Sequence, residues 1–506
     1  MQSLIKYCKK NYKVIIFIFA LLVINYFALR TLQMDFGTDT SHKYSLIITI
    51  IFAVAQILLY LLVIYMNNKK FKIENIFLCF AIILGLSYLL AIPIGRVPDE
   101  QTHFLRAYEI SEGYLVSDKS SKGSGGRELS NDVIKIFESE SQRLNYKSMY
   151  ENIKIEKSTE TNFQLFPNTA LYAFICYIPQ AMGIFIGKIL GLPTLMLAYL
   201  GRLFNLATWI SIMYFTIKKI PLKKLAIFAF AFMPMSLQEA SSLSADALTN
   251  AMAFALIGFV FYMKYEKKGL MNKKEMILMI LLAIIMSMCK IVYLPLCLTL
   301  FLIPKDRFKS NKDKYTKIIL LAIFVVLINF IWLCISATFL NEIREGVNSG
   351  EQVKFVLTNP INYLQVLFYT VYNNFHLYII HFVGASLCYF DVNLSLIYIY
   401  LYLLILIIIL LFDSNKKIDK SDKFMMLFVI IACMLLMFTS LYVQWTYLKS
   451  NIIDGVQGRY FIPLLLPLAF LLNIKVKSNI IKEKYIHLLI IFINFYALMT
   501  LFFNHI

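Results

Sequence analysis

The sequence predicts an all-α polytopic integral membrane protein with about thirteen transmembrane helices. Of its 506 residues, 59% are apolar and only 16% are charged, a balance that excludes an ordinary soluble globular protein. Apolar runs of about 20 residues recur along the chain, and each is long enough to cross a hydrocarbon core about 30 Å thick. Lys and Arg collect in short clusters between these runs, which is typical of cytoplasmic loops.

The formal net charge of +19 does not indicate a nucleic-acid partner, because the basic residues lie in loops between apolar runs rather than on a soluble domain. The eight cysteines are scattered, mostly inside apolar runs, and none forms a CxxC pair. They are expected to pack as small hydrophobic residues, so the sequence predicts neither a disulfide framework nor a zinc site.

The first three predicted spans are 14–32, 44–66 and 76–95. The lysine-rich start, "MQSLIKYCKKNYK", is expected inside, and its apolar stretch is too long for a signal peptide. The cluster "NNKKFK" at 67–72 returns to the cytoplasm, so the third span ends at the outer face. Residues 1–75 therefore form two helices that precede the membrane core.

A long polar segment follows the third span and is expected at the outer face. Over 96–165 its acids and bases nearly balance, unlike the lysine-rich loops. Its "SSKGSGG" sequence at 120–126 is expected to be a flexible loop tip without the features of a P-loop. The apolar stretch 168–190 is predicted to lie in the membrane interface, because counting it as a crossing would place the following "KKIPLKK" outside. The alternative, that 168–190 spans the membrane, remains open.

The remaining segments alternate across the membrane. The stretch 275–304 is lysine-flanked at both ends and about 45 Å long as a helix, so it is predicted to be a hairpin that breaks near Lys290. The core, 76–475, then has an outer loop at 96–194 and a second outer region at 339–393, and 476–506 holds a last helix. The other predicted spans are 195–217, 225–242, 247–264, 317–338, 394–412, 424–444, 459–474 and 484–503.

The sequence "RVPDEQTHFLRAYEI" follows the third span directly. Pro98 suits a helix start, and spacings of four and seven place Asp99, His103 and Arg106 on one helical face. A carboxylate in this position, Asp99 with Glu100 beside it, can take a proton from an acceptor hydroxyl or ligate a divalent cation. His103 and Arg106 are candidate substrate-binding residues. The alternative is a capped helix with a solvated first turn and an internal Asp–Arg pair.

Further polar residues fall at the outer ends of predicted spans, where ionisable groups usually serve a site or a pathway. The basic ones can hold a phosphate; alternatively, they extend to lipid headgroups. Asp246 can instead cap the helix that follows it. His376 and His381, five residues apart, are expected to be interfacial aromatics rather than ligands. The candidate binding residues are Arg202 and Asn205 in "GRLFN", Asp246 in "SSLSADALTN", Lys290 in "CKIVYLP", and Gln457, Arg459 and Tyr460 in "GVQGRYFIP".

In this order, "PDEQTHFLRAYEISEG", "GRLFN", "SSLSADALTN", "CKIVYLP" and "GVQGRYFIPLLLP" resemble the bacterial membrane family catalogued as domain of unknown function 2142. The resemblance covers about residues 76–475. That family looks related to the GT-C superfamily of glycosyltransferases, which use polyprenyl-phosphate sugars at the outer membrane face. The resemblance implies that Asp99, with Glu100 beside it, occupies the catalytic acidic position, and that Asp246 occupies a second one.

The sequence therefore predicts an inverting glycosyltransferase of the cytoplasmic membrane. Asp99 would deprotonate or orient a hydroxyl of a cell-envelope glycan or glycolipid acceptor. Arg459, with Lys290 or Arg202, would stabilise the departing polyprenyl phosphate, and a divalent metal ion at the acidic motif stays an open alternative. The rival hypotheses are a flippase for lipid-linked saccharides and a non-catalytic protein of envelope-polymer assembly.

Overall fold

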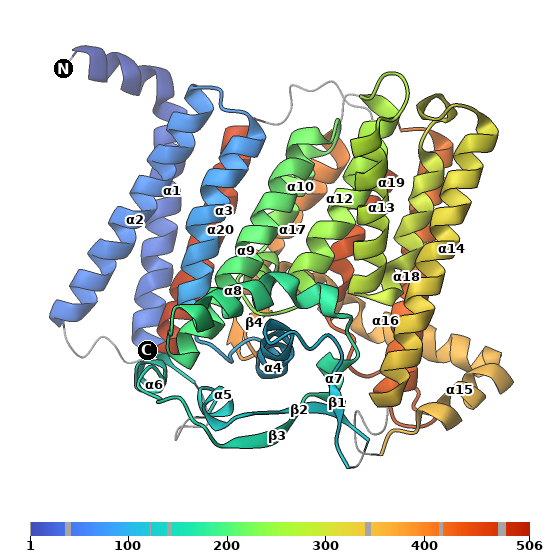
Figure 1. The fold of residues 1–506 in the computed structure, drawn as a ribbon. Helices are drawn as coiled ribbons and strands as arrows, with labels where there is room; N and C mark the ends of the chain where they lie inside the picture. The colour runs from blue at the N-terminus through green and yellow to red at the C-terminus, as the bar shows by residue number, and fades with distance from the viewer. Residues whose placement is uncertain are drawn as a thin grey trace.

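Long apolar helices form most of the computed structural model, which describes residues 2–35, 42–121, 123–138, 144–339, 346–413, 418–473 and 482–506. Eight helices of this described part are long and apolar enough to cross a membrane, in agreement with the predicted polytopic fold. They run side by side in one bundle (Figure 1). They are α1 (Gln2–Asp35), α2 (His42–Asn68), α3 (Ile73–Ala91), α9 (Thr194–Lys219), α12 (Asp246–Tyr265), α14 (Asn311–Ser336), α18 (Lys420–Gln444) and α20 (Glu483–His505).

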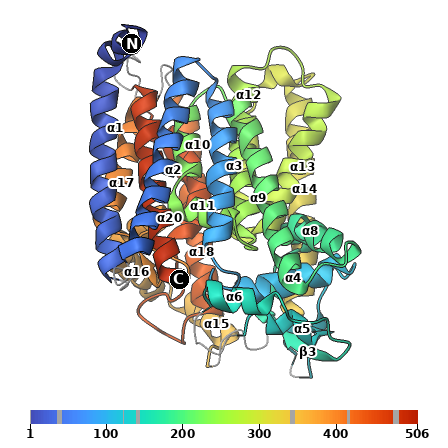
Figure 2. The same ribbon diagram turned by 90° about the vertical axis from the view of Figure 1, so that its left-hand side faces the viewer.

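The spanning helices differ in how much of their surface the protein covers. α12 and α20 are almost wholly buried within the bundle, whereas α1 and α2 are mostly exposed. α20 packs against α1, α2 and α3, so the last helix of the chain lies inside the bundle. Figures 1 and 2 show α1 at the edge of the bundle, where apolar side chains on its surface face lipid.

Several apolar segments are broken rather than continuous. The predicted span 225–242 is wrong as a single helix, because Pro234 cannot donate a backbone N–H bond and begins a new helix. The hairpin predicted at 275–304 does break at Lys290, and its second arm is a 3₁₀ helix that contains Pro295. The predicted span 459–474 likewise starts as a 3₁₀ helix. The broken segments are α10 (Lys224–Ala231) with α11 (Pro234–Ala240), α13 (Lys273–Cys289) with η3 (Ile291–Leu302), and η6 (Gly458–Leu464) with α19 (Leu465–Leu471).

The polar segment after α3 forms a cap over one end of the bundle, called here the α4 end (Figure 1). It contains a three-stranded antiparallel sheet in the order β1-β2-β3, with Gly126 opposite Leu165 and Ser130 opposite Thr161. The all-α prediction missed this sheet, in which Gly125 and Gly126 of the expected loop tip begin a strand. The cap comprises α4 (Glu100–Ser111), β1 (Asp118–Lys119), β2 (Gly125–Ser130), α5 (Asn131–Lys135), α6 (Tyr146–Asn152), β3 (Thr161–Leu165), α7 (Pro167–Ala170), η2 (Phe174–Tyr177) and α8 (Ile178–Ile189).

Helix α8 lies across the direction of the long helices at the α4 end (Figure 1). This orientation agrees with the interfacial interpretation of 168–190. Pro179 occupies the first turn of α8 and does not break it. Gly183 is needed for close packing, because a Cβ there would collide with the backbone carbonyl of Leu200 on α9. Pro179 therefore starts α8, and Gly183 fixes it against α9.

The predicted second outer region contains two helices and a short hairpin. α15 (Ser349–Thr358) and α16 (Pro360–Val383) precede the paired strands β4 (Ser386–Leu387) and β5 (Val392–Asn393). α16 lies near the α4 end in both views (Figures 1 and 2) and crosses the bundle direction. α17 (Leu396–Phe412) then returns along the bundle, and η4 (Lys305–Arg307) and η5 (Ala337–Phe339) flank α14.

The lysine-rich connections share the opposite end of the bundle. Figures 1 and 2 place the α2–α3 connection, with "NNKKFK", and the α12–α13 connection, with "EKKGLMNKK", at the end away from α4. A bundle with its basic loops at one end is what the charge pattern of the sequence requires.

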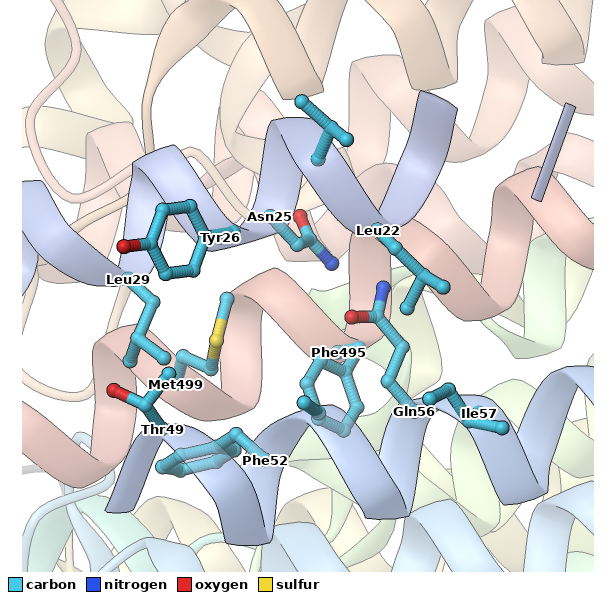
Figure 3. A pocket seen from close by; sticks show the side chains of 12 residues that line it. Leu22, Asn25, Tyr26, Leu29, Thr49, Phe52, Gln56, Ile57, Phe495 and Met499 are labelled. Carbon is cyan, nitrogen blue, oxygen red and sulfur yellow. The ribbon is translucent and has the colours of Figure 1, made fainter. Parts of the chain in front are cut away.

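A cavity of about 250 Å³ lies between α1, α2 and α20. Figure 3 shows its amides, Asn25 and Gln56, among apolar side chains. Asn25 Oδ1 accepts a hydrogen bond of 3.2 Å from Tyr398, and Gln56 Nε2 donates one of 2.6 Å to Tyr60. The lining consists of Leu22, Val23, Asn25, Tyr26, Leu29, Thr49, Phe52, Ala53, Gln56, Ile57, Phe495 and Met499.

Candidate functional site

Arg459 is the centre of a cluster of charged side chains at the α4 end. Its guanidinium lies 3.1 Å from Glu239 Oε1, 3.7 Å from Asp246 Oδ2 and 4.0 Å from Asp99 Oδ2. These carboxylates come from α11, the start of α12 and the turn before α4. Arg459, Glu239 and Asp246 are buried, so the attractions between them are little screened by water.

Lys290 is the second cation of the cluster. Its ammonium pairs with Asp246 and lies 4.9 Å from the ring of Tyr460 and 5.5 Å from that of Tyr172. The break between α13 and η3 gives Lys290 an extended backbone, with φ −150° and ψ 118°. The N-cap position of α12 is Ala245, and Asp246 is the first residue of the helix. The Asp246 carboxylate pairs with Lys290.

Asp99 differs from the other acids because its side chain is 48% exposed. Its backbone is left-handed, with φ 61° and ψ 11°, a conformation that most residues adopt only at some cost. Its carboxylate accepts a 3.3 Å hydrogen bond from Asn168, and its N–H donates 3.2 Å to the Tyr389 hydroxyl. It makes no cap hydrogen bond, so the alternative of a simple helix cap does not describe it.

His103 joins this cluster from the first turns of α4. Its Nδ1 lies 2.8 Å from the Tyr177 hydroxyl, and its ring stacks near Tyr172. Burial lowers the pKa of His103 to about 4, with Asp99 and Asp246 opposing this shift and Arg459 and Lys290 adding to it. His103 is therefore neutral at pH 7.

We expect His103 to make the stability of the protein depend on pH. Its pKa is lower in the folded state than its ordinary value near 6.5, so the unfolded chain binds the extra proton. The stabilisation is complete above pH 6.5 and is lost as the pH falls toward 4, by at most about 3 kcal/mol. The unfolding temperature of His103→Gln should therefore fall less between pH 7 and pH 5 than that of the wild type. His376→Gln, at an exposed site, is the control, and parallel curves for His103→Gln and wild type would contradict the assignment.

Glu100 and Arg202 form a fully buried ion pair beside the cluster. Arg202 Nε and Nη2 donate to the two carboxylate oxygens over 2.7 and 2.6 Å. The backbone N–H groups of Gly95 and Leu243 also donate hydrogen bonds to the Glu100 carboxylate. The predicted roles of Glu100 in catalysis and Arg202 in substrate binding are not supported by this placement, because both side chains are closed off and saturated by protein partners.

Arg106 also lies away from the cluster. It is buried and pairs with Glu109, which also accepts a hydrogen bond of 2.8 Å from Arg127. The predicted common face with Asp99 fails because Asp99 precedes α4 in a left-handed conformation, so helical spacing does not extend to it. Arg106 instead joins α4 to the segment before β1, since it donates a hydrogen bond of 2.9 Å to the Leu115 carbonyl.

Asn205 holds the turn that leads into Asp246. Its amide donates to the carbonyls of Ser242 and Ser244 over 2.8 and 3.1 Å. It therefore positions Asp246 rather than contacting a ligand, contrary to its predicted binding role.

Three buried polar atoms around Arg459 have no hydrogen-bond partner among the described residues: Glu239 Oε2, Arg459 Nε and Gln457 Oε1. Buried polar atoms are rarely left unpaired without a ligand, a water or a functional reason. The Tyr460 carbonyl, in contrast, accepts 2.7 Å from Tyr293. Tyr460 lies at the cluster, because the Lys290 ammonium is 4.9 Å from its ring. The binding roles of Gln457 and Tyr460 stay predictions.

Glu239 is not among the predicted site residues, although the sequence carries a signal for it. Glu239 lies within the apolar stretch 225–242, and an ionisable residue at membrane depth is costly unless it serves a site. Tyr172, Tyr177, Asn168 and Tyr389 carried no such signal, because their roles depend on the folding of the cap.

The acidic motif does not fit a protein-held divalent cation. Glu100 faces Arg202, Asp246 faces Lys290, and Asp99 is left as a single open carboxylate. Across the described ranges, no group of three His, Cys, Asp or Glu side chains is arranged to hold a metal ion. No step is therefore assigned to a metal.

The segment that carries Arg459 packs directly on α16. A Cβ on Gly458 would lie 2.5 Å from the Phe382 nitrogen and 2.7 Å from the Tyr378 carbonyl oxygen. Because backbone atoms cannot yield as side chains do, we expect Gly458→Ala to destabilise the protein by about 1–3 kcal/mol. Thermal unfolding in detergent measures this, with Gly350→Ala as the control, where the nearest atom is 3.6 Å away. Equal unfolding temperatures would show that α16 and η6 can separate freely.

A family model described as "Predicted membrane protein (DUF2142)" matches residues 81–468. The chain belongs to the DUF2142 family. The DUF2142 segment runs from α3 to α19 and includes Asp99, Glu239, Asp246, Lys290 and Arg459, whereas α1, α2 and α20 lie outside it. No curated protein and no solved structure matches the chain. The family confirms a membrane protein, and the relation to GT-C enzymes stays a prediction.

Proposed function

We propose that the protein is a membrane glycosyltransferase that moves a sugar from a polyprenyl-phosphate donor to a cell-envelope glycan or glycolipid. The supporting observation is the placement of Asp99, an open carboxylate, 4.0 Å from the buried cation Arg459 at one end of the bundle. A group that can accept a proton thus lies beside a group that can bind a phosphate.

In this mechanism an acceptor hydroxyl oxygen attacks the anomeric carbon of the donor while the bond from that carbon to the phosphate oxygen breaks. Asp99 takes the hydroxyl proton, and the configuration at the anomeric carbon inverts. Arg459 and Lys290 balance the charge of the departing polyprenyl phosphate. Glu239 and Asp246 hold these two cations in place by ion pairs.

The unpaired polar atoms near Arg459 also support a ligand of this class. Glu239 Oε2 and Gln457 Oε1 are acceptors that are buried without a hydrogen bond in the described structure. Arg459 Nε is a buried donor whose nearest carboxylate oxygen, Asp246 Oδ2, lies 3.7 Å away, too far for a hydrogen bond. Leaving such atoms unpaired costs about 1–3 kcal/mol each. A ligand that carries both hydroxyl donors and phosphate acceptors satisfies all three.

The proposal places the α4 end outside the cell and the lysine-rich end in the cytoplasm. In this proposal the chain crosses the membrane about thirteen times in a GT-C-like arrangement. Each broken segment counts toward the crossings, and α8 lies in the interface. A Ser121→Cys variant tests the orientation, since its thiol should react with an impermeant reagent on intact cells. If the thiol reacted only after lysis, the protein would have the opposite orientation, with the site in the cytoplasm.

The decisive experiment uses purified protein with a panel of radiolabelled polyprenyl-phosphate sugars and an envelope-glycan acceptor. We expect acceptor-dependent release of polyprenyl phosphate from one donor, and loss of that release in Arg459→Ala. A flippase would bind the lipid without releasing phosphate. No binding and no release by folded protein would instead favour a role in polymer assembly.

A further inference from the structure

Helix α16 exposes a continuous apolar face at the α4 end. Ile361, Leu364, Phe368, Tyr372 and Phe375 follow one another at spacings of three or four residues, so they form one stripe along the helix. Each of these five side chains is between 60% and 73% exposed. The 24 residues of α16 include no Asp, Glu, Lys or Arg.

The opposite face of α16 is fixed against the protein. Tyr363, Val366 and Leu367 pack with Phe438 and Tyr442 of α18. The hydroxyls of Tyr363 and Thr439 lie 2.6 Å apart, and the Ile453 N–H donates 2.9 Å to the Thr370 hydroxyl. α16 therefore cannot rotate to bury its apolar stripe within the described structure.

Water is an unfavourable environment for this stripe. Each large side chain gains about 1.5–3 kcal/mol on leaving water, and a helix on an aqueous surface normally carries charged residues on its open face. The hydrocarbon core is also unsuitable for the whole helix, because Tyr369, Asn373 and His376 of α16 are exposed as well. Tyrosine and other amphipathic side chains prefer the boundary between headgroups and acyl chains.

We infer that α16 is an interfacial helix whose aromatic stripe inserts among the lipids of the leaflet at the α4 end. The lipid-facing surface of the bundle continues into it, because His376 on α16 is hydrogen-bonded to the Tyr400 hydroxyl of α17 over 2.8 Å. Next to Tyr400, Ile397 of α17 is exposed as well. The stripe and α17 thus form one surface for bilayer lipid.

This placement sets the depth of the charged cluster. Tyr378 and Phe382 of α16 contact Gly458 without space for a methyl group, and Arg459 follows directly. An apolar stripe buried about 5–10 Å into the boundary between headgroups and acyl chains keeps the backbone of α16, and with it Arg459, near the level of the lipid phosphates. The inference does not depend on sugar transfer and holds for any reaction at this site.

The test uses the full chain in vesicles of phosphatidylethanolamine and phosphatidylglycerol, with Cys8→Ser and Cys334→Ser to limit background labelling. Tyr372→Cys and, separately, Phe375→Cys carry a fluorophore. Nitroxide lipids labelled at the headgroup, near the top of the acyl chain or at its end serve as quenchers, and iodide reports contact with water. Lys354→Cys on exposed α15 and Leu435→Cys on spanning α18 are the matched controls.

We expect the nitroxide near the top of the chain to quench both α16 labels at least about threefold more than iodide does. The Lys354→Cys label should respond mainly to iodide, and the Leu435→Cys label to a deeper nitroxide. Iodide quenching at Tyr372→Cys would overturn the inference by placing the stripe in water. Strongest quenching by the chain-end nitroxide would overturn it by placing α16 within the core, and protection from every quencher would show that protein covers the stripe.

Discussion

Asp99→Asn should lower the turnover of sugar transfer by about 10²- to 10⁴-fold, because an amide cannot accept the proton of the acceptor hydroxyl. The fold should persist. The Asp99 side chain is about half exposed and accepts one hydrogen bond, from Asn168. Asparagine also tolerates the left-handed backbone at this position better than most residues.

The measurement is initial-rate kinetics of phosphate release with the donor that the wild type recognises. Asp118→Asn is the matched control, because Asp118 lies in the same cap, is more exposed and pairs with Arg127 instead of the cluster. We expect kcat to fall in Asp99→Asn with little change in KM. A kcat within twofold of wild type would remove Asp99 from the chemistry and leave it an anchor for Asn168.

Arg202→Ala should destabilise the protein by about 3–5 kcal/mol, the usual result of removing one partner of a buried ion pair. Arg202 donates to Glu100 and to the carbonyls of Leu89, Ile92 and Pro93. Its loss leaves a buried carboxylate without its counter-ion and removes the guanidinium donor from the Leu89 and Ile92 carbonyls, whereas the Pro93 carbonyl still accepts from the Arg96 N–H. Because these atoms form the turn between α3 and α4, the position of Asp99 depends on them.

Thermal unfolding of the protein in detergent, followed by size-exclusion chromatography, measures this effect. Lys188→Ala is the control, because Lys188 pairs with the partly exposed Glu112 and should contribute about 0–1 kcal/mol. The double variant Glu100→Gln with Arg202→Met should recover part of the stability, since no charge is then left unpaired. An Arg202→Ala variant as stable as the control would show that water replaces the guanidinium.

Local patterns explain the parts of the fold that could be predicted. The ends of α9 and α12 and the break at Lys290 follow from apolar length and from flanking lysines, both of which are visible in a short stretch of chain. The interfacial interpretation of 168–190 followed from the charge rule for its neighbours, and the orientation of α8 across the long helices agrees with it. The sheet of the cap could not be predicted in this way, because β2 pairs with β3 about thirty residues away and its sequence, "GGRELS", lacks clear alternation.

The sequence by itself determined that this is a multi-pass membrane protein of a recognisable family, and that polar residues recur at one end of its spans. Only the tertiary structure decided which of these residues meet. It separated Glu100, Arg106 and Asn205 from the cluster and brought in Glu239. Helical spacing predicts on which face of a helix a residue lies, but not which residue of another element it contacts. The packing of the elements decides which opposite charge lies close enough to pair with a buried charge.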